Sequence, residues 1–172
     1  MQGKPLVGIS SCLLGENVRY NGEVKLNPAV KYELGDRISF FPVCPETESG
    51  MPVPREPMDL FVVNGVVRMI TLESQKDKTE VVSDWIESKL NELSVLKLCG
   101  FVFKARSPSC AINSAKIHID SSFDSNGEGL FAKAFMERFP LLPVEEEGRL
   151  QNAAERDKFL KKVFLIHQSY IG

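Results

Sequence analysis

The chain has 172 residues, of which 43% are hydrophobic and 26% are charged. This balance is typical of an ordinary globular domain and excludes a disordered or fibrous chain. The formal net charge of -2 gives no global reason to expect binding of bulk nucleic acid or of an anionic membrane surface. No apolar stretch approaches the roughly 18 residues of a membrane span, and the start of the sequence shows no secretion signal. We therefore expect a cytoplasmic protein with one domain over residues 1–172.

The first part of the sequence alternates between strand-like runs and a helical segment. Residues 5–10 and 37–43 are β-rich apolar runs bounded by turn residues, as buried strands commonly are. Between them, residues 27–35 carry the signals of a short helix, with Asn27 at the start, a proline in the first turn and Gly35 at the end. These patterns predict a strand, a helix and a second strand in that order.

The middle of the sequence predicts a hairpin followed by a long helix. Residues 59–71 hold two apolar runs joined by Asn64-Gly65, a pair that tolerates positive φ and favours a hairpin turn, which we expect beside the functional site. Residues 77–80 resemble a capping box, which marks the start of a helix. Spacings of three and four then predict one buried helix face formed by Val82, Trp85, Ile86, Leu90, Leu93 and Leu96.

Strand-like and helical segments also alternate in the last part of the chain. The pattern predicts a strand at residues 98–104, a helix at 127–139, a short strand at 141–144 and a terminal helix at 150–170. Such alternation implies parallel strands joined by right-handed crossovers, with helices on both faces of the sheet. The predicted fold is an α/β three-layer sandwich in a single domain, with a mostly parallel, Rossmann-like sheet.

Three of the four cysteines occupy the same kind of position. Cys12, Cys44 and Cys110 each follow a predicted strand, in turns rich in serine, proline and glycine. The three sulfurs would then converge at the carboxyl edge of the sheet, where open α/β sheets bind ligands. This arrangement of cysteines predicts a site for an iron-sulfur cluster or for a metal ion with one open coordination position. The alternative is that the three cysteines are unrelated buried thiols. Cys99 begins the strand that leads to Cys110, and we expect it in the core at the opposite end of the sheet.

Several common motifs are missing from the sequence. The cysteine spacing contains no Cys-x2-Cys pattern, and a chain of this length does not need disulfides. The two histidines, His118 and His167, have no metal-ligand partner at helical spacing. There is no dinucleotide-binding glycine motif after a strand, no P-loop and no Gly-x-Ser-x-Gly elbow. The missing motifs argue against dinucleotide, nucleoside triphosphate and serine-hydrolase chemistry of those kinds.

Polar residues near the cysteines are candidates for catalysis and binding. Glu46 lies two residues after Cys44, either within proton-transfer reach of a ligand at that sulfur or in solvent. Ser107 and Ser109 precede Cys110 and are candidates for orienting a substrate or water, or for hydrogen bonding within the turn. Cations that could offset an anionic cluster or hold a phosphate, some of them expected to be ordinary surface residues, are Arg19, Lys25, Arg55, Lys104 and Arg106.

Taken together, these motifs resemble a known family. They are Ser-Ser-Cys-Leu-Leu-Gly at residues 10–15, Arg-Tyr-Asn-Gly at 19–22, Cys-Pro-Glu at 44–46, Pro-Val-Pro-Arg at 52–55 and Ser-Pro-Ser-Cys at 107–110. The set resembles the family first catalogued as the domain of unknown function DUF523 and now linked to thiouracil desulfurases, the TudS-like proteins. The resemblance runs from Lys4 to the stretch that ends at Leu150, nearly the whole chain.

The resemblance implies a 4Fe-4S cluster held by Cys12, Cys44 and Cys110, with the fourth iron free to take sulfur from a thiocarbonyl compound. It also implies a non-redox hydrolysis that releases sulfide from a small-molecule thiolated base or nucleotide of the 2- or 4-thiouracil type. On this basis we assign Glu46 and Ser107 to catalysis. The residues expected to bind the substrate are Ser10, Arg19, Arg55, Lys104 and Ser109.

Other classes of function stay open at this point. A non-catalytic iron-sulfur or metal-binding protein with a structural or sensing centre needs the same cysteines but can leave Glu46 in solvent. A zinc hydrolase is a weaker option, because three thiolates make zinc a poorer Lewis acid. Ala111 stands where the family is expected to have glycine after Cys110, which bears on the shape of the pocket and not on ligation by the cysteine.

Overall fold

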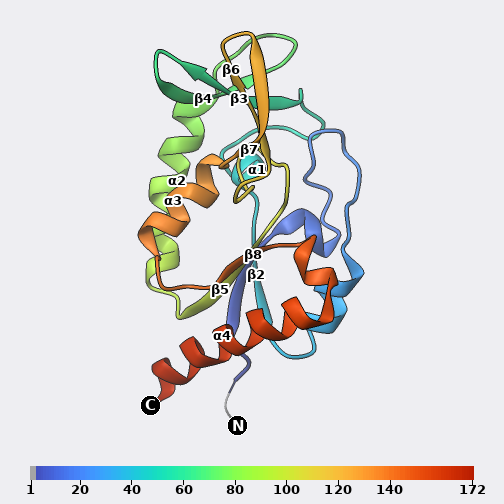
Figure 1. Cartoon of the computed structure of the whole chain (residues 1–172), viewed down its shortest axis with the longest axis vertical. Helices are drawn as coiled ribbons and strands as arrows, with labels where there is room; N and C mark the ends of the chain where they lie inside the picture. Colours follow the sequence, from blue (N-terminus) through green and yellow to red (C-terminus); the bar gives the residue numbers. More distant parts are fainter. Residues whose placement is uncertain (1–2) are drawn as a thin grey trace.

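The computed structural model describes residues 3–172, which form two β-sheets flanked by helices (Figure 1). The strands are β1 (Leu6–Ser10), β2 (Ser39–Val43), β3 (Met58–Val63), β4 (Val66–Thr71), β5 (Leu98–Phe103), β6 (Ala115–Ile119), β7 (Ser122–Gly127) and β8 (Val144–Glu146). The helices are α1 (Pro45–Glu48), α2 (Thr79–Ser94), α3 (Leu130–Arg138) and α4 (Ala153–Ile171), with shorter helical turns η1 (Ser11–Leu14), η2 (Ala29–Leu34) and η3 (Arg149–Gln151). Within the described range, no helix is both long and apolar enough to cross a membrane.

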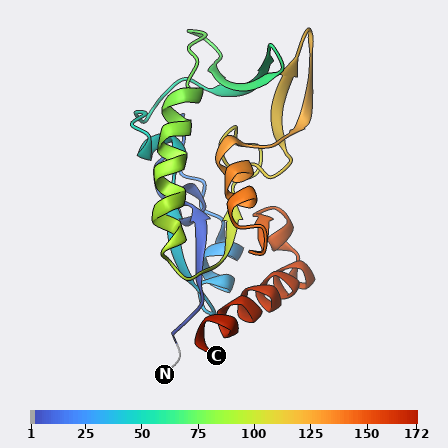
Figure 2. The same ribbon diagram turned by 90° about the vertical axis from the view of Figure 1, so that its left-hand side faces the viewer.

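The first sheet has the strand order β2-β1-β5-β8, and each neighbouring pair is parallel. Of its two central strands, β5 is fully buried. Helices lie on both faces of this sheet, with α2 and α3 on one face and α4 on the other (Figures 1 and 2). Phe101 and Phe103 join a core cluster with α2 and α3, whereas Val102 joins a second cluster with η2 and α4. The predicted α/β class, with helices on both faces of a parallel sheet, is confirmed.

A glycine in β1 allows its close packing against β5. Gly8 pairs with Phe101, and a Cβ atom at residue 8 would lie only 2.2 Å from the Phe101 ring. That ring makes edge contacts with Phe131 and Phe135 of α3, with centroid distances of 5.6 and 4.9 Å. Any larger residue at position 8 would push Phe101 out of this aromatic cluster, so Gly8 helps to fix the two strands whose ends carry the site.

The second sheet has the order β4-β3-β6-β7 and was predicted only in part. The β3-β4 hairpin turns at Asn64-Gly65 with φ angles of 51° and 76°, as the sequence indicated. The β6-β7 hairpin was not predicted, because Ser122–Gly127 is mostly exposed and polar and therefore lacks the alternation that marks a half-buried strand. Parallel pairing between β3 and β6 joins the two hairpins into one sheet.

Smaller differences from the sequence predictions occur at the ends of elements. Residue Glu46, expected in a loop, lies in the short helix α1, and β8 occupies Val144–Glu146 and not residues 141–144. Helix α2 begins at Thr79 without the expected capping box, since Asp77 accepts the Thr79 backbone N-H at 2.8 Å just before the helix. Each shift is local and leaves the order of strands and helices unchanged.

Candidate active site

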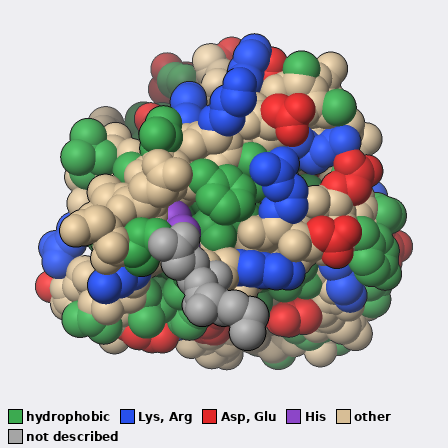
Figure 3. Space-filling model, turned by 90° about the horizontal axis from the view of Figure 1, so that it is seen from below, with side chains coloured by type: hydrophobic (Ala, Val, Ile, Leu, Met, Phe, Trp, Pro, Cys, Tyr) green, Lys and Arg blue, Asp and Glu red, His purple; other side chains and the backbone are tan. Residues whose placement is uncertain are grey.

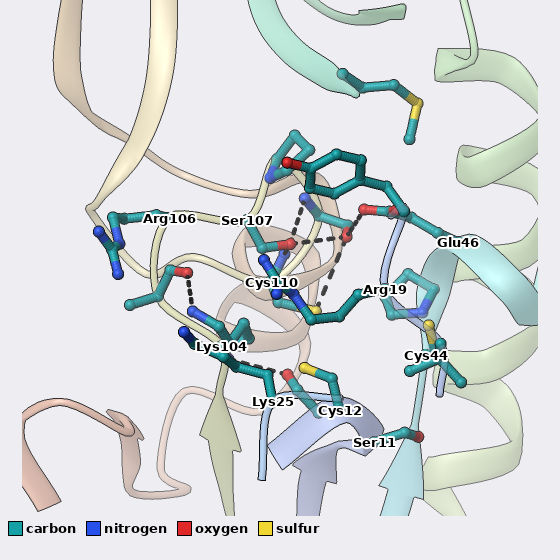
Figure 4. A pocket seen from close by; sticks show the side chains of 18 of the residues that line it. Ser11, Cys12, Arg19, Lys25, Cys44, Glu46, Lys104, Arg106, Ser107 and Cys110 are labelled. Atoms are coloured by element: carbon teal, nitrogen blue, oxygen red, sulfur yellow. Dashed lines mark hydrogen bonds between the residues drawn. The ribbon is translucent and has the colours of Figure 1, made fainter. Parts of the chain in front are cut away.

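The carboxyl ends of β1, β2 and β5 meet around one cavity of about 380 Å³ (Figure 4). Cys12 lies in η1 directly after β1, Cys44 follows β2, and Cys110 lies in the loop after β5. All three line the cavity, as predicted from their positions after parallel strands. The same cavity is lined by the other residues selected from the sequence, which are Ser10, Arg19, Glu46, Arg55, Lys104, Ser107 and Ser109.

Burial raises the pKa of all three thiols above the ordinary value of 9.0. The pKa of Cys12 rises to about 11, because desolvation outweighs the opposing charges of Lys104 and Arg19. Cys44 adds to the increase at Cys12, and at Cys110 the charges of Cys12 and Cys44 act in the same direction as burial. A metal centre bound by these thiols must displace their protons.

The donor set suits an iron-sulfur cluster better than a single metal ion. Among residues 3–172, no group of three or more Cys, His, Asp or Glu side chains is close enough to hold one metal ion. Thiolates on one zinc ion lie roughly 3.8 Å apart, whereas those on three corners of a 4Fe-4S cube lie roughly 6 to 7 Å apart, as estimated from metal-sulfur geometry. Three soft thiol donors line one open cavity, and thiolates are the ligands that iron-sulfur clusters take.

Cys110 is positioned by its own turn and by the start of α3. Ser107 Oγ accepts the backbone N-H of Cys110 at 3.0 Å. Gly129 packs so closely that a Cβ there would lie 2.5 to 2.6 Å from backbone atoms of Ser109 and Cys110. Ala111 is fully buried in the core and does not line the cavity, so the presence of alanine in place of the expected glycine adds no methyl group to the pocket.

Two carboxylates at the end of β8 hold the two ends of the Cys110 loop. Glu147 accepts the Ala105 backbone N-H at 2.6 Å and the Lys104 ammonium at 2.8 Å. Glu146 accepts the Ile112 backbone N-H at 2.8 Å. The positive charge of Lys104 is consequently balanced by Glu147, at a position where both side chains are only 12% exposed.

Glu46 is buried in the cavity wall and is held by Arg55. Only 8% of Glu46 is exposed, and its Oε2 accepts a hydrogen bond from Arg55 Nε at 2.7 Å and forms an ion pair with Arg55 Nη2 at 2.6 Å. Arg55 Nη2 also donates to the Val18 carbonyl at 2.8 Å, and Nη1 donates to the Pro52 carbonyl at 3.1 Å. Three of the five guanidinium N-H groups therefore donate hydrogen bonds inside the protein. Arg55 orients Glu46, and most of its hydrogen-bonding capacity is already used.

The two serines of the Cys110 loop form a hydrogen-bonded chain that ends at Glu46 (Figure 4). Ser109 Oγ donates to Glu46 Oε1 at 3.0 Å, and Ser107 Oγ lies 3.1 Å from Ser109 Oγ. Because Ser109 has one hydroxyl proton, Ser107 is the donor in the second hydrogen bond. Ser109 is almost completely buried, whereas Ser107 is partly exposed. Ser107 thus connects the accessible part of the cavity with the buried carboxylate.

The remaining polar residues surround the thiols with positive charge. Ser10 Oγ accepts the Lys104 backbone N-H at 3.0 Å, and its hydrogen bond with Cys110 counteracts the effect of burial on the pKa of that thiol. Arg19 lies 3.4 Å from a carboxylate oxygen of Glu23 and is partly exposed. Two further cations of the cavity, Lys25 and Arg106, are exposed and less constrained than the buried lysine (Figure 4).

Some residues of the cavity were missed by the sequence analysis. They are Ser11, Val18, Tyr20, Val43, Pro45, Pro57, Met58, Asp59, Ala105 and Pro108. The Arg-Tyr-Asn-Gly motif contains Tyr20 and offered a signal for it, since the preceding arginine was selected. Asp59 lies in the predicted hairpin, and only the expectation that this hairpin sits beside the site pointed toward it.

The fold and the cavity define an α/β protein with a thiol-lined site suited to an iron-sulfur cofactor. A family model described as 2-thiouracil desulfurase matches residues 7–147, and the chain belongs to this family. The curated protein YbbK of Bacillus subtilis (strain 168), described as uncharacterized, is 30% identical over 111 residues, and the match covers 61% of this chain and 72% of that protein. The solved structure of the 4Fe-4S-dependent thiouracil desulfidase TudS is 28% identical, with coverage of 86% of this chain and 94% of that chain and a TM-score of 0.63.

These comparisons confirm the resemblance inferred from the motifs. They also confirm the predicted class of enzyme, a thiouracil desulfurase, at the level of the family. The predicted cofactor agrees with the one in the name of TudS. The roles of individual residues stay predictions, which the geometry now makes specific.

Proposed function

We propose that this chain converts a thiouracil-type base, free or within a nucleotide, to the corresponding uracil compound by hydrolysis. The carbon-sulfur double bond is exchanged for a carbon-oxygen double bond, water supplies the oxygen, and the sulfur leaves as hydrogen sulfide. No electron donor or acceptor is consumed. The observation that carries this proposal is the meeting of three thiols and the buried carboxylate of Glu46 in one cavity.

Cys12, Cys44 and Cys110 would hold a 4Fe-4S cluster like the one named for TudS. When bound by three protein thiolates, such a cluster supplies a Lewis-acidic iron with a free position for the thiocarbonyl sulfur. The cysteines would bind it as thiolates, and the charges of Lys104 and Arg19 oppose the effect of burial on the Cys12 pKa and so favour that form. The cavity thus combines soft ligands with nearby cationic side chains.

Glu46 is placed to act first as a base and then as an acid. Arg55 balances the charge of its carboxylate and fixes its orientation through a hydrogen bond and an ion pair. As water attacks the ring carbon, Glu46 takes up one proton of that water. Return of this proton to the departing sulfur restores the carboxylate. The second proton of the water also passes to the sulfur as the carbon-oxygen double bond forms, so hydrogen sulfide leaves and Glu46 ends the cycle in the state in which it began.

Ser107 and Ser109 give this proton a route to the buried carboxylate. Transfer from water to Ser107 is matched by transfer from Ser107 to Ser109 and from Ser109 to Glu46, along the hydrogen bonds already present. Each hydroxyl gives one proton and gains one, so neither serine becomes charged. This route accounts for the selection of Ser107 as catalytic and makes Ser109 its link to Glu46.

The position of Glu46 favours an enzyme over a structural or sensing centre. A non-catalytic centre requires no carboxylate beside its ligands, and burying one costs free energy unless it is paired. Glu46 is buried, paired with Arg55 and directed into the cavity that holds the thiols. A buried and paired carboxylate at this position can serve proton transfer, whereas holding a cluster does not require it.

The test of this function is a labelled-water assay on protein purified without oxygen. Iron and sulfide analysis with an ultraviolet-visible spectrum measures cluster content. The protein is then incubated with 2-thiouracil, 4-thiouracil and their nucleotides in water enriched in oxygen-18, without reductant. We expect equal amounts of sulfide and uracil product, with the label in the product.

Two results would contradict the proposal. One is a fully loaded protein that releases no sulfide from any of these compounds. The other is product that forms only after a reductant is added, or that carries no label from water. A variant with serine at Cys12, Cys44 and Cys110 is the matched control, since it keeps the size of the cavity lining but removes the thiols.

A further inference from the structure

A second carboxylate that lines the cavity has no role in the proton transfers proposed for Glu46. Asp59 is the second residue of β3, between the buried residues Met58 and Leu60, and strand alternation turns its side chain away from the core. It lines the same cavity as the three cysteines, although it comes from the second sheet. Its side chain is 18% exposed, so it is accessible from the cavity but largely shielded from bulk water.

His118 of the neighbouring strand β6 fixes the orientation of Asp59. His118 Nε2 lies 2.7 Å from Asp59 Oδ2, and because an ionised carboxylate only accepts hydrogen bonds, Nε2 carries the proton. The imidazole ring stacks on Phe61, with a centroid distance of 4.3 Å and an interplanar angle of 9°. Lys116 Nζ, at 3.9 Å from the same oxygen, adds a weaker attraction. Asp59 is therefore held at Oδ2 by side chains outside the cavity lining.

The two carboxylates that line the cavity, Glu46 and Asp59, differ in how many further hydrogen bonds they can accept. Glu46 accepts a hydrogen bond from Arg55 at Oε2, which also forms an ion pair with Arg55 Nη2, and it accepts a hydrogen bond from Ser109 at Oε1. Asp59 uses Oδ2 for His118, and within residues 3–172 no hydrogen bond reaches its Oδ1. Asp59 therefore presents an oriented and open acceptor to whatever enters the cavity.

We propose that Asp59 accepts a hydrogen bond from the ring N-H that flanks the thiocarbonyl group of the substrate, with His118 as its positioning residue. This inference rests on the proposed function and names a contact that selects the substrate. In both 2- and 4-thiouracil, N3 carries a hydrogen and adjoins the thiocarbonyl carbon. N3 stays unsubstituted when the base is part of a nucleotide, so the contact does not depend on which form enters.

The contact has a chemical consequence beyond binding. A carboxylate that accepts the N3-H bond favours the thione form of the ring, in which the carbon carries a double bond to sulfur and a hydrogen stays on nitrogen. An anionic ring, or a tautomer with the hydrogen on sulfur, is a poorer target for water. Asp59 thereby keeps the substrate in the form that the attack requires, while Glu46 manages the proton of the water.

The test combines variants of Asp59 with a substrate that lacks the N3-H group. The wild type, Asp59→Ala and Asp59→Asn are loaded with cluster and assayed with 4-thiouracil and 3-methyl-4-thiouracil. We expect the wild type to favour 4-thiouracil by about 10- to 100-fold in kcat/KM, the usual worth of a hydrogen bond to a charged group. Asp59→Ala should lose this preference because its activity falls only on 4-thiouracil. Asp59→Asn should lose it too, since its amide oxygen faces His118.

A binding measurement separates this inference from the function on which it rests. Calorimetry on the cluster-loaded protein compares uracil with 3-methyluracil, and neither compound contains sulfur to be removed. Tighter binding of uracil by the wild type and equal binding of both by Asp59→Ala would support the contact even if no sulfide were released. Loss of sulfide release alone would overturn the proposed function and leave this result standing.

Two controls and two opposing outcomes complete the design. Asp124→Asn, at an exposed position of β7, should behave like the wild type. His118→Ala should reduce the substrate preference less than Asp59→Ala does, because it removes the support and not the acceptor. Equal losses on both substrates in Asp59→Ala would overturn the inference. An unchanged preference for 4-thiouracil in both Asp59 variants would overturn it as well, since the methyl group would then be excluded by shape alone.

Discussion

The two ends of the parallel sheet hold cysteines in different surroundings. At the carboxyl end, Cys12, Cys44 and Cys110 share a cavity with several cations. Near the amino end of β5, Cys99 is fully buried in the core and lies 3.5 Å from the Lys97 carbonyl and 3.9 Å from His167 Nδ1. On the molecular surface at the end where the termini lie, acidic, basic and apolar side chains are mixed (Figure 3).

Burial alone does not distinguish the functional thiols from the core thiol. It raises the pKa of Cys99 as it raises the pKa of the three cysteines in the cavity. The difference lies in what surrounds each sulfur, which is a shared space with compensating charge in one case and packed side chains in the other. Whether a buried cysteine can bind a cofactor therefore depends on its neighbouring side chains and on its access to a cavity.

The largest effect is expected from the loss of a cysteine in the cavity. Cys44→Ser should remove nearly all bound iron and all sulfide release, because a hydroxyl is a poor ligand for iron-sulfur clusters. Cys99→Ser should keep the iron content of the wild type. Iron and sulfide analysis after anaerobic purification provides the comparison, and equal iron in both variants would remove the distinction between the two ends of the sheet.

The next effect concerns the carboxylate among the cavity thiols. Glu46→Gln keeps the size of the side chain but cannot take up a proton, so sulfide release should fall by roughly 10² to 10⁴ while cluster content is unchanged. Initial rates at saturating thiouracil measure this loss. Glu56→Gln is the matched control, because Glu56 lies near the site but does not line the cavity. A fully loaded Glu46→Gln variant with the wild-type rate would assign the proton transfer to another group.

A variant of Arg55 tests whether this residue mainly positions Glu46 or mainly binds the substrate. Arg55→Lys keeps the charge but loses the contact of two guanidinium nitrogens with Glu46, and we expect kcat to fall by about 10- to 100-fold with little change in KM. Arg37→Lys, at an exposed ion pair, should have no effect. A rise in KM at constant kcat would instead show that the substrate-binding role predicted from the sequence is the main one.

A smaller effect is expected at the entrance of the serine chain. Ser107→Ala removes the donor to Ser109 but keeps Glu46 and its arginine, so kcat should fall by roughly 3- to 10-fold, the worth of one neutral hydrogen bond. The solvent isotope effect on kcat should change as well, because the proton then reaches Glu46 by another route. Unchanged values of both quantities would show that water reaches the carboxylate without Ser107.

The smallest effect is a change in stability at the core cysteine. Cys99→Ser places a hydroxyl in a packed environment, and we expect the free energy of unfolding to fall by about 1 to 3 kcal/mol. Denaturant titration of the cluster-loaded protein measures this change. Wild-type iron content together with reduced stability would identify Cys99 as a packing residue, whereas a coupled loss of iron would connect it to the site.

The sequence by itself determined the parallel sheet and most of the site. Cys12, Cys44 and Cys110 each follow an apolar run, and parallel strands have a direction, so the ends of three such strands meet at one edge of the sheet. Glu46 was identified because it lies next to one of these cysteines. The β3-β4 hairpin was identified because Asn64-Gly65 marks its turn. These features depend on local patterns and on strand polarity, which a sequence records directly.

Only the tertiary structure decided which charged side chains form ion pairs within the protein. It also decided that the second sheet contributes a residue to the lining of the cavity. Arg55 and Lys104 were selected as substrate-binding cations, yet they pair with Glu46 and Glu147. Asp59 joins the cavity from a second sheet, part of which is an exposed polar hairpin without a hydrophobic pattern. Pairing between distant side chains depends on how separate segments pack together, and spacing along the chain carries no record of those contacts.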